Sequence, residues 1–327
     1  MPSSCNCYRS IHNRAVKVTQ VAIRPSEAST EAGRPSLTPE LLAASGARYS
    51  RNNEGLESIL SKIDPKHLEK SVDSIFRMVD YGHQSIADMV PVAMFIDDVS
   101  MWLAYYIWTL CPTAGGQESS TRYIKISVDG LIAPESLGIR PEHIGEWKDL
   151  MAQAFQAYQT VVKIWEDLAV ENPSLMGIPK SLLEDKSETA LKKVMRMTRN
   201  YGFDRSRYFL PVSAATNIML IMSARGWVSL CQHLLSHQLP ECNRVGELIR
   251  DELQISAPRM TKHARATEYH RAMIETEFQK LVKTAQKTQE QTSEAGIPSL
   301  TVSLPDGIHE NDLSDDLKYH ANRYAPV

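Results

Sequence analysis

The spacing of hydrophobic residues divides the chain into a series of predicted helices and a few short strands. The clearest helix is predicted over Glu142–Val170, where large apolar residues recur every three or four positions. Its apolar face comprises Ile144, Trp147, Met151, Phe155, Tyr158, Val162, Trp165 and Leu168. Met89–Ile96 is apolar with little polar interruption and predicts a buried strand. Ser100–Leu110 predicts a buried helix, although periodicity alone does not separate helix from strand there.

Weaker patterns predict further elements. A helix start is predicted at Thr38, because this capping hydroxyl precedes Pro39 and Glu40 in a first turn. Other helices are predicted over Glu54–Lys62, Leu68–Asp80, Ser187–Asn200, Ala224–Ser236, Arg244–Leu253 and Glu268–Gln289. Strands are predicted over Val16–Ile23, Tyr123–Val128 and Asn217–Met222.

No low-complexity linker or internal repeat divides the chain, so the pattern predicts one mostly helical α+β domain. We expect this domain over residues 37–290. Residues 1–36 are predicted to form an N-terminal extension, and residues 291–327 a polar C-terminal tail.

The composition narrows the class of protein. The 327 residues carry 36 Lys and Arg against 39 Asp and Glu, and this slight acidity argues against a dedicated nucleic-acid binder. The longest strongly apolar stretch, Met101–Pro112, is much shorter than the roughly 20 residues of a membrane span. The 5 cysteines are few and odd in number, which favours reduced thiols over a disulfide framework. We therefore expect a cytoplasmic protein with no membrane or nucleic-acid partner.

The most unusual segment is the sequence GGQESSTRY at Gly115–Tyr123. Its two glycines let the backbone approach a ligand closely. Hydrogen-bonding side chains follow, and the planar guanidinium of Arg122 suits a phosphate or a carboxylate. The spacing of a GxxxxGK[ST] phosphate loop is absent. On spacing alone, the segment is either an anion-binding loop or a solvated turn capped by serine.

Two other segments concentrate polar groups near chain turns. His83, Ser85 and Asp88 cluster after a predicted helix end. Arg207 and Arg225 lie close to apolar runs, where an arginine needs an anionic partner. Helix capping and internal ion pairs would satisfy the same residues without any ligand.

Taken in order, these segments resemble the flavin-dependent thymidylate synthases. That family's signature is an Arg-His-Arg triplet followed by xxSxNExSxRY. The residues that match it are Glu118, Ser120, Arg122 and Tyr123, with Gln117 in place of the Asn. An upstream Gly-His-x-Ser/Thr-x-x-acid motif matches at Gly82, His83, Ser85 and Asp88. A downstream motif matches at Arg207, Leu210, Pro211, Thr216, Ala224 and Arg225, with Ser223 in place of an Asn.

The chain also departs from the family pattern. Leu110-Cys111-Pro112 stands where the family has Arg-His-Arg, and Gly115 replaces the first Ser of the signature. Ser229 falls where an Asn or His is common, and Leu234 where the family places a further nucleotide-binding Arg.

The resemblance implies a mostly helical single domain around a small antiparallel sheet, assembled as a homotetramer with FAD. The implied reaction is reductive methylation of dUMP at C5 to dTMP, with methylenetetrahydrofolate as the carbon donor and NADPH as the flavin reductant. Arg122 and Arg207 would hold the dUMP phosphate, while Gln117, Glu118 and Ser120 would contact the nucleotide. Glu118 and Ser120 would be the catalytic pair. His83, Ser85, Asp88, Ser223, Arg225 and Ser229 would line the FAD site.

Other interpretations stay open from the sequence. The chain could be a divergent homologue that methylates another pyrimidine nucleotide, or one that has lost catalysis and serves as a helical assembly protein. Cys111 is a candidate covalent nucleophile for uracil C6. His233 and His237, four residues apart on a predicted helix, are candidate metal ligands with Cys231, Glu241 and Cys242 nearby. We expect no metal site, because no HExxH pattern accompanies these histidines.

Overall fold

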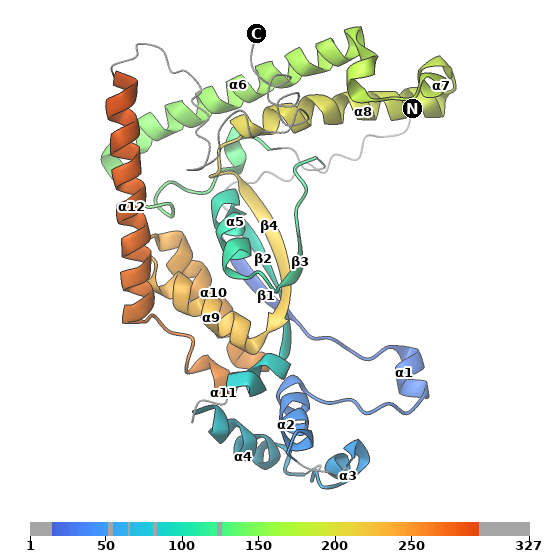
Figure 1. Ribbon diagram of the computed structural model, residues 1–327, viewed down its shortest axis with the longest axis vertical. Helices are drawn as coiled ribbons and strands as arrows, with labels where there is room; N and C mark the ends of the chain where they lie inside the picture. The colour runs from blue at the N-terminus through green and yellow to red at the C-terminus, as the bar shows by residue number, and fades with distance from the viewer. Residues whose placement is uncertain (1–14, 52–54, 65, 81–83, 123–125, 294–327) are drawn as a thin grey trace, which may run out of the picture. The chain divides into compact units, whose positions relative to one another are not determined.

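A computed structural model gives the structure of the protein, and it describes residues 15–51, 55–64, 66–80, 84–122 and 126–293 (Figure 1). The chain divides into two compact units, Met1–Ile274 and Glu275–Val327. Helix α12 (Glu268–Ser293) crosses the boundary between them. Among the described residues, no helix is both long and apolar enough to cross a membrane. The predicted extension at 1–36 and tail at 291–327 stay predictions.

The centre of the first unit is a four-stranded antiparallel sheet in the order β1-β2-β4-β3 (Figure 1). Its strands are β1 (Lys17–Val21), β2 (Pro91–Ser100), β3 (Gly115–Glu118) and β4 (Ala215–Ser223). The mostly helical α+β fold around a small antiparallel sheet is therefore confirmed. The strands predicted within Val16–Ile23, Met89–Ile96 and Asn217–Met222 are confirmed as well.

Two sequence interpretations need correction at this sheet. The sequence predicts a loop or turn at Gly115–Glu118, yet these residues form the edge strand β3. The strand predicted over Tyr123–Val128 is wrong at its described end, because Val128 begins the short 3-10 helix η2 (Val128–Gly130). Residues 123–125 lie outside the described residues. Pairing with a partner strand decides β structure in short segments more than local propensity does.

One face of the sheet packs into the main core. Side chains on this face alternate along β2 and β4, as a half-buried strand requires: Val92, Met94 and Ile96, then Ile218, Leu220 and Met222. Helices α5 (Met101–Leu110), α9 (Ala224–Ser236) and α10 (Pro240–Ser256) share that core. Trp227 of α9 is fully buried, and its indole nitrogen donates to the carbonyl of Val92 at 3.1 Å. The predicted buried helix over Ser100–Leu110 is thus confirmed as α5.

The opposite face of the sheet leaves large apolar side chains in contact with solvent. Val21 and Ile221 pair with Ala93 in one cross-strand row, and Phe95 lies in the next row along β2. Val21 is 44% exposed, Phe95 42% and Ile221 40%. We call Val21, Phe95 and Ile221 the open sheet face. Large apolar side chains exposed in neighbouring rows of one sheet face make this face a candidate interface.

A helical group forms from the chain between β1 and β2. It comprises α1 (Glu27–Glu31), α2 (Pro39–Tyr49), α3 (Leu56–Ser61), α4 (Leu68–Asp80) and the 3-10 helix η1 (Gln84–Met89). The predicted helix start at Thr38 is confirmed, with Pro39 in the first turn. The expected cap is wrong, because the Thr38 hydroxyl makes no capping hydrogen bond.

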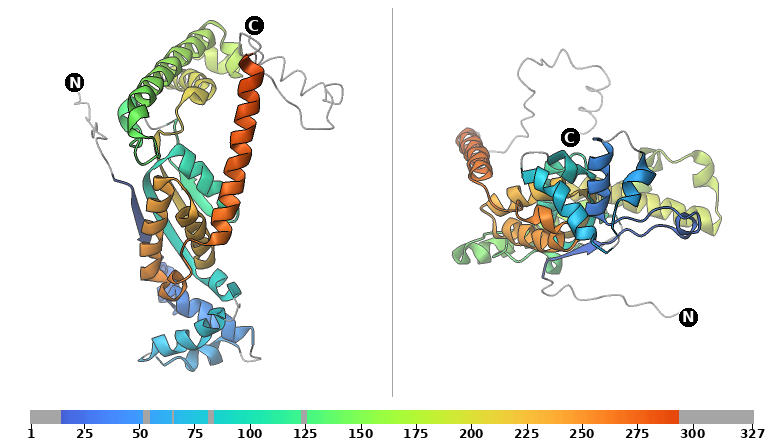
Figure 2. Two further views of the ribbon diagram at one scale, coloured as in Figure 1. Left: turned by 90° about the vertical axis from the view of Figure 1, so that its left-hand side faces the viewer. Right: turned by 90° about the horizontal axis from the view of Figure 1, so that it is seen from below.

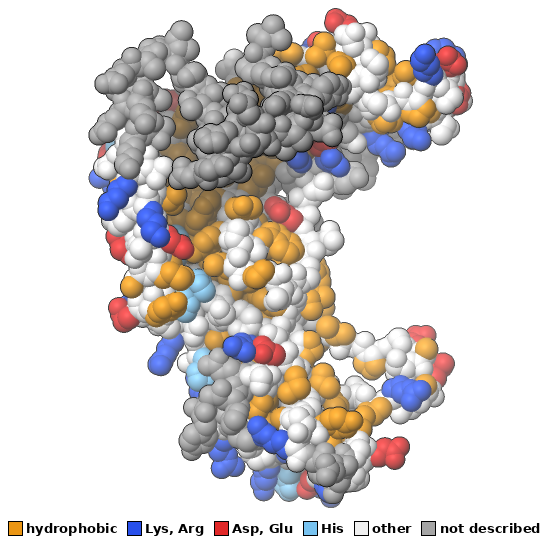
Figure 3. Space-filling view, viewed as in Figure 1, with side chains coloured by type: hydrophobic (Ala, Val, Ile, Leu, Met, Phe, Trp, Pro, Cys, Tyr) orange, Lys and Arg blue, Asp and Glu red, His pale blue; other side chains and the backbone are white. Residues whose placement is uncertain are grey.

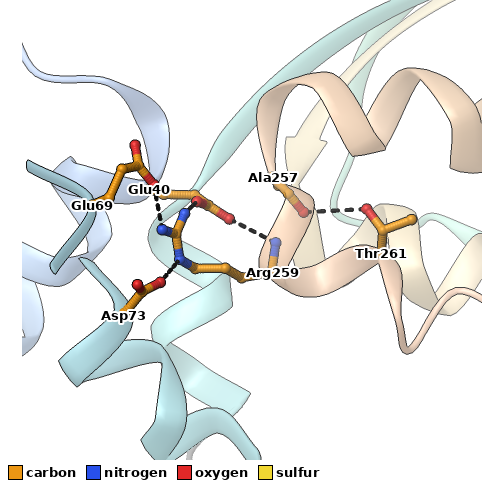
Figure 4. Close-up of polar contacts among 6 residues, drawn as sticks. All are labelled: Glu40, Glu69, Asp73, Ala257, Arg259 and Thr261. Atoms are coloured by element: carbon orange, nitrogen blue, oxygen red, sulfur yellow. Dashed lines mark hydrogen bonds and ion pairs between the residues drawn. The ribbon is translucent and has the colours of Figure 1, made fainter.

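One arginine joins this helical group to a distant helix. Arg259 of α11 (Pro258–Thr261) forms ion pairs with Glu40 of α2 and with Glu69 and Asp73 of α4 (Figure 4). Its Nε lies 2.7 Å from Asp73 Oδ1, and its backbone N–H donates to Glu40 at 3.1 Å. Burial raises the pKa of the Glu40 carboxyl, and the Arg259 contacts oppose that rise.

Helices α6 (Ile144–Glu171) and α8 (Glu188–Ser206) pack side by side (Figure 2). Gly202 permits their close approach, because a Cβ at that position would lie 3.0 Å from the carbonyl oxygen of Val162. Phe155, Phe203 and Leu210 form a separate small core there. The remaining short helices are η3 (Pro141–His143), η4 (Pro173–Met176), α7 (Lys180–Glu184) and η5 (Arg207–Phe209). The helix predicted over Glu142–Val170 is confirmed as α6.

Candidate functional site

The edge strand β3 comprises the first four residues of the GGQESSTRY segment. Gly116 pairs with Leu220 of β4, and a Cβ at Gly116 would lie 2.2 Å from the carbonyl oxygen of Met219. Only glycine therefore allows the two backbones to approach this closely. Successive strand residues point to opposite faces, so Glu118 lies on the core face and Gln117 on the open sheet face. The structure does not bring these two predicted nucleotide contacts together on one face.

Glu118 lies at the end of β3, where it is held by a neighbouring strand. Its Oε1 accepts a hydrogen bond from the Thr216 hydroxyl of β4 at 3.2 Å. The surrounding protein removes part of the hydration of the Glu118 carboxyl and raises its pKa, and the bond from Thr216 opposes that rise. A carboxyl in this environment retains its proton to higher pH than a free glutamate.

Arg122 and Arg207 converge on one carboxylate. Arg122 forms a two-point ion pair with Asp204 of α8, with Nε and Nη2 donating at 3.0 and 2.7 Å. Arg207, at the start of η5, lies 3.9 Å from the same Asp204. All three side chains are partly exposed. Arg122 shows the two-point geometry that binds carboxylate or phosphate oxygens, and Arg207 adds a second positive charge nearby.

Sequence reasoning missed Asp204 and Asn217. Asp204 stands three residues before Arg207, which is the spacing of an ion pair within a helix, but both residues lie beyond the predicted helix Ser187–Asn200. The Asn217 side chain accepts from the backbone N–H of Asp98 at 2.9 Å and donates to Ser119 Oγ at 3.4 Å. Asn217 thereby ties the chain after β3 to a bulge in β2, where Asp98 has a positive φ of 58°. No spacing signal could have found these contacts, because the partners of Asn217 lie 119 and 98 residues away in the chain.

Ser120 shapes the turn that leads to Arg122. Its hydroxyl oxygen accepts from the Arg122 backbone N–H at 3.3 Å. The Ser120 side chain is exposed, so it is accessible to a ligand. Along the chain, Ser120 lies between Glu118 and Arg122, and all three are predicted to contact the nucleotide.

A second polar cluster forms where β4 ends and α9 begins. Ser223 is the N-cap of α9, and its hydroxyl oxygen accepts from the Gly226 N–H at 3.1 Å. One carboxylate oxygen of Asp88, in η1, lies 2.9 Å from Nη1 of Arg225. The other carboxylate oxygen of Asp88 lies 3.5 Å from Ser223 Oγ. The Ala224 N–H donates to the Val90 carbonyl at 2.8 Å, which fixes the two chain segments together. The structure thus brings three predicted FAD-site residues into one cluster.

The other predicted FAD residues are less closely connected. Ser229 lies one turn beyond Arg225 on α9 and is exposed, and its carbonyl contacts the His233 ring at 2.9 Å. Ser85 is exposed on η1. His83 lies outside the described residues.

The two clusters lie at opposite ends of one strand. Thr216, which holds Glu118, is near the start of β4, and Ser223 is its last residue. Seven residues of extended chain separate them by about 24 Å. The Glu118–Thr216 contact and the Asp88 cluster are therefore well separated along β4.

Cys111 is buried where α5 ends. Burial raises the pKa of its thiol to about 11. A thiol in this environment stays protonated at neutral pH, whereas a nucleophile needs the thiolate. The structure therefore gives no support to the covalent hypothesis.

The residues considered as metal ligands have other partners. Glu241 accepts from the Ser100 N–H at 2.7 Å and from its hydroxyl at 2.8 Å. The His237 ring contacts the aromatic rings of Trp102 and Tyr106. Among the described residues, no three such side chains are grouped to hold a metal ion.

Comparison with known protein families identifies the family of this chain. A family model described as thymidylate synthase complementing protein matches residues 36–259, which is more than half of the chain. The chain belongs to this flavin-dependent family. The match spans all three motif segments and both polar clusters.

Two curated relatives match over part of their length. UPF0159 protein Ta1429 of Thermoplasma acidophilum is 27% identical over 235 residues, which cover 67% of this chain and 47% of that protein. A UPF0159 protein of Chlamydia pneumoniae is 23% identical over 291 residues, which cover 81% of this chain and 53% of that protein. The chain spans about half the length of these relatives.

A solved structure is also similar. It is a UMP/dUMP methylase, PolB from Streptomyces cacaoi, bound with 5-Br dUMP. The TM-score is 0.45 at 14% identity, and the match covers 77% of this chain and 95% of that one.

Proposed function

We propose that this protein is a thymidylate synthase-like methyltransferase that uses FAD to methylate dUMP at C5 and release dTMP. Methylenetetrahydrofolate would supply the carbon and NADPH would reduce the flavin. Family membership supports the class of reaction. The single observation that carries the nucleotide site is the convergence of Arg122 and Arg207 on Asp204.

In this proposal the arginine pair binds the dUMP phosphate. The phosphate replaces the Asp204 carboxylate, because both are anions and the phosphate carries more charge. Gln117, Glu118 and Ser120 contact the nucleotide, with Ser120 close to the uracil ring. Glu118 and Ser120 are the proposed catalytic residues, and the raised pKa of Glu118 suits a group that holds a proton near a reacting base.

The proposed flavin site is built on the N-terminus of α9. The Ser223 hydroxyl and the guanidinium of Arg225 lie together at this helix start, and a guanidinium and a hydroxyl suit the diphosphate of FAD. Asp88 orients Arg225, and Ser229 extends the site by one turn. His83 and Ser85 complete the proposed FAD residues. The flavin, when bound, supplies the hydride chemistry.

We propose a homotetramer in which different copies complete each site. The separation of the two clusters along β4 supports shared sites. The open sheet face supplies an apolar surface for assembly, since Val21, Phe95 and Ile221 remain exposed. The buried Cys111, Cys231 and Cys242 are free thiols, which fits a reducing cytoplasm.

A second candidate function rests on the end of α5. Leu110-Cys111-Pro112 provides no cationic side chain where the family's signature has three residues. A divergent homologue that methylates another pyrimidine nucleotide, or a non-catalytic nucleotide-binding protein, would be consistent with that loss.

Calorimetric titration of the purified protein with dUMP tests the nucleotide site. We expect Arg122→Ala to weaken binding about 10- to 100-fold, because it removes a charge-assisted contact. Arg140→Ala is the matched control, since Arg140 is an exposed arginine paired with Glu142 at 3.2 Å. Unchanged dUMP affinity in a folded Arg122→Ala protein would refute the phosphate assignment.

The flavin site has its own test. The protein is incubated with FAD, freed of excess flavin by gel filtration, and examined by visible absorption. About one retained flavin per chain, lost in Arg225→Ala, would support the proposal. Release of tritium from dUMP labelled at C5 then measures methylation. A colourless protein that still binds dUMP would favour the non-catalytic alternative.

A further inference from the structure

A cavity of about 490 Å³ lies within the helical group, away from both polar clusters. Its apolar lining comes from all three main helices of that group. Ala47 belongs to α2, Ile59 to α3 with Ile63 just beyond it, and Ile75 to α4. The volume is in the range of small-molecule sites, about 300–1,000 Å³.

The polar part of the described lining is entirely cationic. Arg48, Arg51 and Lys62 line the cavity together with the aliphatic side chains, and no carboxylate is among the described lining residues. All three cations also interact within the chain, so the argument rests on the sign of the lining charge. Hydrophobic side chains with Lys and Arg around them gather over α2 and α3 in the space-filling view (Figure 3).

The walls of this cavity are held in place without a ligand. Arg259 binds Glu40 of α2 and Glu69 and Asp73 of α4, so these two helices are tied to α11 and to each other (Figure 4). Arg48 adds a second tie at the other end of α2, because its Nη2 donates to Ser74 Oγ of α4 at 3.4 Å. A site that is formed in advance spends little binding energy on ordering its walls.

We propose that this cavity binds a small organic anion with an apolar body, such as an alkyl or aryl carboxylate, phosphate or sulfonate. The aliphatic lining removes the apolar body from water. The cationic side chains pair with the anionic head at the mouth of the cavity. Neither a neutral apolar compound nor an inorganic anion satisfies both halves of the lining. The site is independent of the proposed methylation, because it shares no residue with either polar cluster.

The probe is anilinonaphthalene sulfonate, an aryl sulfonate whose fluorescence rises on entering an apolar site. The full-length protein is titrated with it. We expect one saturable site per chain, displaced by octanoate but not by octanol or inorganic phosphate. Arg51→Glu combined with Lys62→Glu reverses two exposed charges and should weaken binding about tenfold or more. The matched control is Lys70→Glu, an exposed charge reversal on α4 outside the lining, which should leave the affinity unchanged.

Two results would overturn the proposal. One is the absence of saturable binding to the folded protein, with folding checked by circular dichroism. The other is equal affinity in the Arg51→Glu, Lys62→Glu variant and in the unmodified protein. Arg122→Ala combined with Arg207→Ala separates this site from the proposed nucleotide site. Loss of the probe in that variant would place it at the arginine pair and refute the cavity assignment.

Discussion

Arg122 and Asp204, 82 residues apart in the chain, form a two-point ion pair with distances of 3.0 and 2.7 Å. Arg207 lies 3.9 Å from the same carboxylate. The pair therefore brings the two predicted phosphate-binding arginines to one place, and it sets an acidic side chain where an anionic ligand would bind. Asp204 is then a competitor for the ligand.

Removing this competitor should strengthen nucleotide binding. We expect Asp204→Asn to raise dUMP affinity about two- to fivefold, which corresponds to the loss of one exposed ion pair. Titration calorimetry at fixed salt measures the change. Asp167→Asn, which removes an exposed pair with Lys163, serves as the control and should have no effect. Weaker binding in Asp204→Asn would instead mean that Asp204 positions the arginines.

A Cβ at Gly116 should weaken the attachment of β3. We expect Gly116→Ala to lower the free energy of unfolding by about 1–3 kcal/mol, because the new methyl group would overlap the Met219 carbonyl. Gly115→Ala in the same strand meets no atom within 4 Å and should change stability by less than about 0.5 kcal/mol. Urea unfolding of both variants provides the comparison. Equal stabilities would show that β3 shifts freely to accommodate the side chain.

Arg259 should stabilise the helical group. We expect Arg259→Met to lower the free energy of unfolding by about 2–4 kcal/mol, because Glu40 would keep a buried charge without its partner. Arg271→Met is the control, since Arg271 is an exposed arginine paired with Glu268, and it should cost less than about 1 kcal/mol. Urea unfolding at pH 7 measures both.

The same variant should show a distinct pH dependence. Burial already raises the pKa of Glu40, and loss of Arg259 removes the contacts that oppose this rise. A carboxyl whose folded pKa is raised binds its proton more tightly in the folded state. The contribution of Glu40 to the free energy of unfolding is therefore greatest below the pKa that Glu40 has in the unfolded chain. It is lost as the pH rises through the pKa of Glu40 in the folded protein. The loss of unfolding free energy in Arg259→Met should shrink when the pH is lowered from 7 toward 4.5, the ordinary pKa of a glutamate carboxyl. If the loss of unfolding free energy in Arg259→Met does not depend on pH, Glu40 is not its source.

The open sheet face should be needed for assembly. We expect Phe95→Glu to reduce the molecular mass of the particle in light scattering after gel filtration, because it places a charge among exposed apolar side chains. Ile255→Glu changes a residue of α10 that is 72% exposed and should leave the mass unchanged. An intact assembly in Phe95→Glu would show that copies associate through another surface.

Much of the fold follows from local sequence pattern. The apolar periodicity of Ile144–Leu168 predicts α6, and the apolar run at Met89–Ile96 predicts β2, because side chains repeat with the geometry of the element they form. Ser223 is an N-cap beside Arg225 because both belong to one short turn. Contacts over a few residues can be predicted in this way.

The tertiary structure decided the rest. Gly115–Glu118 has no local preference for a strand and becomes one through pairing with β4. That pairing puts Glu118 beside Thr216 and turns Gln117 to the other face. Asp204 of α8 meets Arg122 across 82 residues of chain, and Arg259 meets Glu40 across more than 200 residues. Local pattern in the sequence predicts the longer helices, three of the four strands and the motif residues, but not the short helices α1, α7 and α11. Which charges meet depends on long-range packing, and no local spacing encodes that.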